Sequence, residues 1–298
     1  MFMRVFTVWQ GPLWTDRASF AILPLRKEER VGKPKLLRRK RLRSTALLAA
    51  GAAVCSPALA GSFLQPPDQG VVIVGGAFSQ AARAYDAYGR LAPVANWRKL
   101  EATTYAEYGV TDWLTAIASP SLFRFRQDFP GQSRSATAIA EAGARVRVHE
   151  WDGNVLSAQL VLRAPLGGAT ARLFADTTRF AQADLRLGYG RGFDLFGFRA
   201  FSDIQIGGRT SGLFGPEARV DATLGLWARE DVLLLLQSFS AATPAGWRRV
   251  RYLQEKAQAS AVYWITPAIG VQAGALAALR GVNASAERGG FTALWYRF

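Results

Sequence analysis

The chain has 298 residues, of which half are hydrophobic, and a formal net charge of +15. Residues 1–60 hold 12 of the 37 Lys and Arg but only 3 of the 22 Asp and Glu, so the charge does not indicate a nucleic-acid-binding surface elsewhere. The single cysteine, Cys55, lies in the same region, which excludes disulfides and thiol chemistry in residues 61–298. No apolar run reaches the roughly 18 residues of a membrane-spanning helix.

The N-terminal region has the three parts of a secretory signal peptide. A basic block, Arg38–Arg43, precedes a short apolar core, Ser44–Val54. The small residues Ala58 and Ala60 then occupy the two positions that a signal peptidase reads. The sequence therefore predicts cleavage directly before Gly61.

Other interpretations of this region are weaker. A lipoprotein anchor at Cys55 is disfavoured, because the preceding Val54 stands where such signals carry a small residue. Residues 1–37 resemble neither a domain nor a targeting element, and we expect translation to start further along at a non-ATG codon. The predicted organisation is an extension (1–37), a signal peptide (38–60) and one domain (61–298).

From Gly61 onward, apolar and polar residues alternate in about twelve segments of roughly ten residues, separated by Gly, Pro, Asp and Asn. In Ala181–Tyr189, for example, Leu185 and Leu187 oppose Asp184 and Arg186. No helical period persists, so the sequence predicts an all-β domain. The expected strands lie near residues 70–80, 98–109, 113–125, 136–149, 154–164, 178–189, 198–208, 217–228, 231–240, 251–265, 269–279 and 290–298.

A soluble β-sandwich would also alternate, with its apolar face inward. Two features favour a closed, antiparallel transmembrane β-barrel of about twelve strands. Charged residues of both signs share the polar faces at mid-strand, as in a polar lumen, and aromatic residues gather at segment ends, as in the girdles of membrane barrels. Those aromatics are Trp97, Tyr108, Trp113, Trp151, Tyr189, Trp227, Trp247, Tyr263, Trp264, Trp295 and Tyr296.

The connections between the expected strands alternate in length. Five are short and six are longer, with the longer ones near 81–97, 126–135, 165–177, 209–216, 241–250 and 280–289. In such barrels the short turns are periplasmic and the long loops extracellular. Both termini are therefore expected in the periplasm.

The last eight residues, Phe291–Phe298, alternate and end on an aromatic residue. Leu294, Tyr296 and Phe298 fall on one face of the expected strand. This ending resembles the C-terminal signal of bacterial outer-membrane barrels. The resemblance implies recognition by the barrel assembly machinery.

Strand parity assigns a set of charged residues to the lumen. Arginine leads among the basic ones, and its planar fork suits carboxylates and phosphates. Either the charges pair and fill the lumen, or they line a channel that selects solutes by charge. Three of these arginines, Arg145, Arg147 and Arg163, lie near a single acid, Glu141. This excess predicts local positive charge, and an open pore is therefore expected to prefer anions. The expected lumen residues are Arg145, Arg147, Arg163, Glu141, Asp184, Arg186, Arg199, Asp203, Arg219 and Asp221, joined by Glu101, Glu107 and Glu255.

Catalytic chemistry is not indicated. The one histidine, His149, is expected to face the lumen, with Glu150 and Ser157 nearby in sequence. A catalytic triad needs a base hydrogen-bonded to its nucleophile, and this spacing across a turn does not provide it. The protein is therefore expected to be no enzyme and to use no cofactor and no metal.

Four phrases together resemble the XagA-like outer-membrane barrels of exopolysaccharide and biofilm loci, and more loosely the barrels of the phenol meta-pathway. They are Gly70–Val74, Glu107–Leu114, Leu234–Phe239 and Ala293–Phe298. The resemblance implies a passive channel or accessory conduit in the outer membrane for surface polysaccharide or small anionic solutes. Its expected partners are outer-membrane lipid and lipopolysaccharide, the assembly machinery and polysaccharide, with no nucleic acid. The alternative is a non-transporting surface protein acting in adhesion or biofilm structure.

Overall fold

The computed structural model describes residues 61–128, 133–166, 181–212, 215–243 and 251–298. No helix in these ranges is long and apolar enough to cross a membrane. The expected extension and signal peptide, with Ala58 and Ala60, lie outside the described residues. The strands are β1 (Gly70–Tyr85), β2 (Leu91–Thr111), β3 (Leu114–Ala118), β4 (Ser121–Gln127), β5 (Ser133–Trp151), β6 (Asn154–Leu166), β7 (Gln182–Leu195), β8 (Phe198–Gly212), β9 (Gly215–Arg229), β10 (Val232–Ala242), β11 (Leu253–Trp264), β12 (Ile269–Val282), β13 (Ala284–Ser285) and β14 (Arg288–Arg297).

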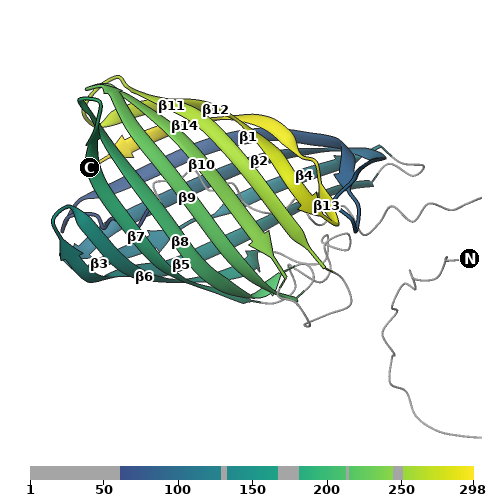
Figure 1. Ribbon diagram of the computed structural model, residues 1–298, viewed down its shortest axis with the longest axis horizontal. Helices are drawn as coiled ribbons and strands as arrows, with labels where there is room; N and C mark the ends of the chain where they lie inside the picture. The colour runs from purple at the N-terminus through teal and green to yellow at the C-terminus, as the bar shows by residue number, and fades with distance from the viewer. Residues whose placement is uncertain (1–60, 129–132, 167–180, 213–214, 244–250) are drawn as a thin grey trace, which may run out of the picture. The chain divides into compact units, whose positions relative to one another are not determined.

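These segments form one closed antiparallel sheet (Figure 1). β3 and β4 are one strand interrupted at Ser119 and Pro120, and the short β13 pairs with β1 beyond the end of β14. The described wall therefore has twelve strands, as the sequence predicts. It closes where β1 pairs with β14, from Val71 opposite Arg297 to Gln80 opposite Arg288.

The interruption at Pro120 follows from its missing N–H, which removes one donor from the ladder. The ladder continues around it, because the Thr104 N–H donates to the Pro120 carbonyl at 2.9 Å and the Ser119 N–H to the Glu141 carbonyl at 2.7 Å. These bonds tie the interruption to the strands on both sides, and a bilayer demands such internal pairing of backbone groups.

The outer face of the wall is apolar and the inner face is largely polar. Leu185 and Leu187 of β7 are 60% and 61% exposed, whereas Asp184, which precedes Leu185 on the same strand, is 5% exposed. This inverts the arrangement of a soluble barrel, in which exposed leucine bands would be unfavourable. The apolar band is thus a lipid-facing surface, and the closed barrel places the protein in the bilayer of the bacterial outer membrane.

The two ends of the barrel differ. The end called here the terminal end carries Phe298 and the tight turns at 112–113, 152–153, 196–197 and 230–231, and the opposite loop end carries the turn at 86–90 (Figure 1). Phe298 closes the seam, since its N–H donates to the Gly70 carbonyl at 3.1 Å and the Gly70 N–H donates back at 2.9 Å. Leu294, Tyr296 and Phe298 lie on the outer face, about half exposed.

Several strands run longer than predicted. The expected loop 81–97 shrinks to Asp86–Arg90, because β1 and β2 stay paired to Tyr85 and Leu91. The expected turn 190–197 shrinks to Phe196 and Gly197, which both adopt positive φ angles. Polar residues in these stretches look like loop in sequence, but pairing satisfies their backbone groups and extends the hairpins.

The inner face also carries an apolar core at the terminal end, built around Trp295 and Ile73, which are both fully buried. This corrects the interpretation of the aromatics. Trp97, Trp264 and Trp295 are buried inside the barrel, and Trp227 packs against the core, whereas Tyr108, Trp113, Trp151, Tyr189, Tyr263 and Tyr296 are exposed as expected of a girdle. Trp247 lies outside the described residues. Composition at strand ends cannot separate the two groups, because parity decides which face an aromatic takes.

Candidate functional site in the barrel lumen

The terminal end of the lumen is occupied by the residues that precede β1. Ser62 is 1% exposed, and its N–H donates to the carboxylate of Asp203 on β8. The Phe63 ring meets Phe201 edge-on, with 6.0 Å between ring centroids. The Gln65 N–H donates to Thr115 Oγ1 at 3.0 Å. The stretch Gly61–Gln69 is named the N-terminal segment. Its first five residues lie inside the wall that the strands form, and residues 66–69 are exposed.

The wall has glycine where the N-terminal segment comes closest. A Cβ at Gly190 of β7 would lie 2.9 Å from the Phe63 ring, and one at Gly188 would collide with the Ser62 side chain. Larger residues at these two inward positions would displace the segment. The glycines therefore leave the space that the N-terminal segment occupies.

Arg145 fixes both the wall and the N-terminal segment. Its guanidinium forms an ion pair with Glu107 at 2.8 Å and donates to Gln159 at 3.1 and 2.9 Å. A further N–H donates to the Phe63 carbonyl at 2.8 Å. Glu107 also accepts hydrogen bonds from the Tyr105 hydroxyl and from Gln65 Nε2. All charges here are buried and partnered, which is the condition under which buried ion pairs are tolerated.

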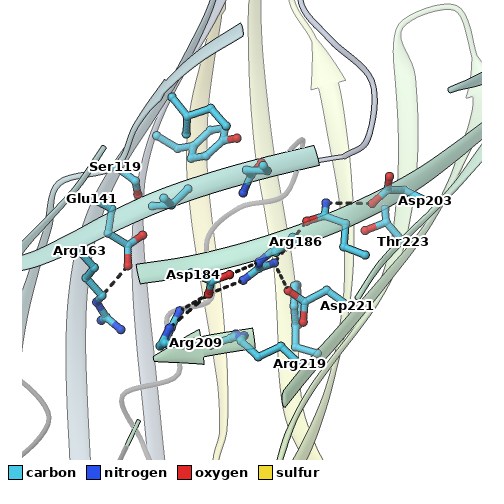
Figure 2. Close-up of a pocket in the computed structure, with 16 residues that line it drawn as sticks. Ser119, Glu141, Arg163, Asp184, Arg186, Asp203, Arg209, Arg219, Asp221 and Thr223 are labelled. Carbon is cyan, nitrogen blue, oxygen red and sulfur yellow. Dashed lines mark hydrogen bonds and ion pairs between the residues drawn. The ribbon is translucent and has the colours of Figure 1, made fainter. Parts of the chain in front are cut away.

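A cavity of about 80 Å³ lies in the lumen between β5, β6, β7, β8 and β9, enough for a few water molecules. Figure 2 shows the guanidinium of Arg186 between the carboxylates of Asp184 and Asp221, with Arg209 on the other side of Asp184. The Arg186 Nε lies 2.7 Å from Asp184 and the Arg209 NH2 3.0 Å from it. Charges of both signs thus line the cavity.

Arg219 of β9 also lines the cavity and differs from its neighbours. It is 6% exposed, yet among the described residues it forms no ion pair, and its buried Nε has no hydrogen-bond partner (Figure 2). Arg163, by contrast, holds Glu141 at 3.0 Å. A buried guanidinium with free donors facing a cavity is suited to receiving an anion.

A third cluster lies toward the loop end. Glu287, in the irregularity between β13 and β14, is 1% exposed and binds Lys256, Lys99 at 3.1 Å and the Ser79 hydroxyl at 2.5 Å. Lys99 also pairs with Glu101 at 3.2 Å. These are the only two lysines after residue 60, and both reach one carboxylate. This lysine cluster is buried and packs part of the lumen.

The ten expected lumen residues fall into separate places. Arg145 belongs to the terminal end, and Arg163, Glu141, Asp184, Arg186, Asp203, Arg219 and Asp221 line the cavity. Arg147 pairs with Glu150 near the turn at 152–153, and Arg199 is exposed at the terminal rim, its guanidinium 5.5 Å from the Trp227 ring. The structure thus does not gather Arg145, Arg147 and Arg163 into one site.

The expectation of local positive charge around those three arginines is wrong for the described lumen. Arg145 pairs with Glu107, Arg147 with Glu150 and Arg163 with Glu141, so each has its own carboxylate. Glu141 and Glu150 lie on β5, close in sequence to Arg145 and Arg147, whereas Glu107 comes from β2. Pairing of β2 with β3, and of β3 with β5, brings that partner to Arg145.

Two parity assignments are also wrong. Glu255 faces outward, pairing with exposed Arg280, because β11 turns its even-numbered residues, including Gln254 and Lys256, into the lumen. His149 faces outward opposite Leu156, because the register shifts between Arg147 and His149. Its ring stacks on Trp151 at 5.1 Å, whereas Ser157 is buried inside. His149 and Ser157 therefore cannot act as a catalytic pair.

Sequence reasoning missed Arg209, Glu217, Lys99, Lys256 and Glu287. Most lie in stretches interpreted as loops or at their borders, so parity was not applied to them. The scarcity of lysine after residue 60 was the available signal for Lys99 and Lys256. Lysine is usually common on exposed surfaces, so a domain with only two lysines suggests that both have a particular role. Among the described residues there is no group of His, Cys, Asp and Glu able to hold a metal.

No family model matches the chain, and no curated protein matches it in sequence. Among solved structures it is similar to an outer membrane channel from Pseudomonas putida F1, with a TM-score of 0.59 at 13% identity over 78% of this chain and 97% of that one. It is also similar to the translocator domain of the autotransporter NalP from Neisseria meningitidis, with a TM-score of 0.45 at 13% identity over 78% of this chain and 90% of that one. The first likeness supports the outer-membrane barrel fold derived above.

Proposed function

We propose that the protein is a narrow outer-membrane channel for small anionic solutes. The observation that carries the proposal is Arg219, a buried guanidinium that faces the cavity and has no carboxylate partner among the described residues. The other cavity arginines are already engaged, with Arg186 and Arg209 on Asp184 and Arg163 on Glu141. An entering anion would accept hydrogen bonds from the free N–H groups of Arg219 without breaking an existing ion pair.

In the proposed channel, buried residues narrow the lumen in two places. The N-terminal segment and the apolar core fill the terminal end, and the lysine cluster packs another part. Twelve strands enclose more room than the eight that wall side chains can fill, and here the additional filling comes from the N-terminal segment. This segment joins the wall at Gly70, so its displacement would widen the terminal end without unfolding the barrel.

Small anions fit this lumen better than a polysaccharide chain does, because the cavity holds only a few water molecules. An accessory role in surface polysaccharide export, as in the XagA-like group, rests on the sequence resemblance alone. No contact among the described residues favours the alternative role in adhesion or biofilm structure.

Channel activity is best tested in planar bilayers. We expect small single-channel conductance with anion preference, and the variant Arg219→Gln should reduce that preference measurably in the reversal potential. Arg147→Gln, which removes an arginine paired near the rim, is the matched control and should leave the preference unchanged. Absence of conductance, or equal ion preference in all three proteins, would contradict the proposed function.

Orientation and assembly are a second part of the proposal. We place both termini in the periplasm and the loop end toward lipopolysaccharide, with the barrel assembly machinery recognising Leu294, Tyr296 and Phe298. Their outward, half-exposed side chains on the seam strand support this assignment. Deleting Phe298 should lower the amount of barrel in outer-membrane fractions, whereas Phe291→Leu on the same strand should not. Normal accumulation without Phe298 would exclude this residue as the signal.

A further inference from the structure

Asp203 is a buried lumen carboxylate that forms no ion pair with any of the described residues. It is 3% exposed, and its described partners are neutral: the Ser62 N–H and the Gln205 amide at 3.1 Å. Other lumen carboxylates, such as Glu107, Glu141 and Asp184, each hold an arginine. A buried carboxylate without a cation is costly, so a partner for Asp203 is to be expected.

Gly61 is the residue that can supply this cation. A Cβ built on Gly61 would lie 3.5 Å from Asp203 Oδ2, so the Gly61 backbone lies against this carboxylate, and rotation about the Gly61 Cα–C bond can turn a free amine toward it. Ser62 next to it already donates its N–H to Asp203. In an uncleaved chain the Gly61 nitrogen is a neutral amide. Hydrolysis of the Ala60–Gly61 bond by signal peptidase would consume one water, leave a carboxylate on Ala60 and release Gly61 with an amine.

We infer that Asp203 is the lumen site for the α-ammonium group of Gly61 that signal cleavage creates. An α-amino group has an ordinary pKa of about 8, so it is mostly protonated at neutral pH. Its ion pair with Asp203 anchors the free end of the N-terminal segment, while Arg145 holds the Phe63 carbonyl and Gly70 holds the other end. Seating of the segment in the lumen is thereby coupled to processing of the precursor.

The inference does not depend on the proposed channel function, and its test does not measure conductance. The processed protein would be purified from outer membranes as Ser62→Cys, which carries a single thiol because Cys55 lies upstream of the cleavage site. A charged methanethiosulfonate reagent would report exposure of residue 62, and intact mass would identify the first residue. Folding of each variant would be checked by heat modifiability on gels.

Two variants remove the ion pair in different ways. Asp203→Asn keeps an acceptor for the Ser62 N–H but loses the charge. Inserting Thr-Asn between Ala60 and Gly61 keeps Asp203 and the Ala58–Ala60 cleavage site, creates no second pair of small residues before Gly61, and moves the ammonium away by about 7 Å. Each should raise the thiol modification rate roughly tenfold. Asp221→Asn, a buried lumen carboxylate paired with Arg186, is the matched control and should leave the rate unchanged.

Three results would overturn the inference. The first is a mature N-terminus other than Gly61. The second is an unchanged modification rate in the insertion variant, which would show that Asp203 acts only through the Ser62 hydrogen bond. The third is an unchanged rate in folded Asp203→Asn. If Asp203→Asn does not fold, the insertion variant still decides, because all its lumen residues are native.

Discussion

Arg145 at the terminal end and Arg219 in the cavity wall are both almost completely buried, at 1% and 6% exposure. Arg145 meets a carboxylate, an amide side chain and a backbone carbonyl, whereas Arg219 meets no carboxylate among the described residues. The two regions use the same residue type on the same inner face. The difference separates an arginine whose donors are satisfied inside the protein from one whose donors are not, and the proposed anion site depends on the second kind.

The largest effect on stability is expected when the Arg145–Glu107 ion pair at the terminal end is broken. Arg145→Met should lower the free energy of unfolding by roughly 3–5 kcal/mol, because Glu107 would remain buried without its cation. Denaturant unfolding in micelles, followed by tryptophan fluorescence, would measure this loss. The double variant Arg145→Met with Glu107→Gln should recover much of it.

Arg147→Met offers a matched control for that experiment. Its pair with Glu150 is a third to a half exposed, so its loss should cost less than about 1 kcal/mol. Equal effects at Arg145 and Arg147 would mean that burial in the lumen does not govern stability. That result would remove the basis of the comparison.

A similar but smaller loss is expected in the lysine cluster. Glu287→Gln should lower the free energy of unfolding by about 3 kcal/mol, because Lys256 then lies buried without an acid while Lys99 retains Glu101. The same unfolding experiment measures it. Adding Lys256→Met should restore stability, and a failure to do so would point to the Ser79 hydrogen bond instead.

The cavity should behave in the opposite way. Arg219→Gln should change the free energy of unfolding by less than about 1 kcal/mol, or raise it, because no described ion pair is lost and a buried charge is removed. Denaturant unfolding of Arg219→Gln and Arg145→Met under the same conditions would test this difference directly. A loss above about 2 kcal/mol would place Arg219 among the structural arginines.

The smallest effect concerns the exposed turn Asp86–Arg90, outside both regions. The pKa of Asp86 lies below its ordinary value, because the carboxylate accepts hydrogen bonds from the N–H groups of Arg90 at 2.9 Å and Tyr88 at 2.8 Å. A lowered folded-state pKa means that the stabilisation is present above the ordinary value of about 4 and is lost as pH falls below it. Lowering the pH should reduce the protection of the Arg90 amide against hydrogen exchange in the native protein. The same change in pH should have a smaller effect on this protection in Asp86→Asn. Parallel profiles would show that the carboxylate does not hold the turn.

The sequence by itself determined the wall. Alternation in segments such as Ala181–Tyr189 has a period that only an extended strand can satisfy, and it also set which residues face lipid. Parity failed where the ladder shifts, as between Arg147 and His149, because one extra residue turns the following side chains to the other face. Pairing beyond the expected ends, as at Tyr85 and Leu91, was equally invisible, since polar residues there resemble loop.

Tertiary structure alone decided the contents of the lumen. Glu107 reaches Arg145, and Glu287 reaches Lys99 and Lys256, across separations that no local pattern encodes. The seating of residues 61–65 inside the barrel likewise depends on the folded wall, since this part of the chain binds β3, β5 and β8 at once. Periodicity reports which face a residue takes, but the partner it meets across the lumen depends on how the closed sheet brings distant strands together.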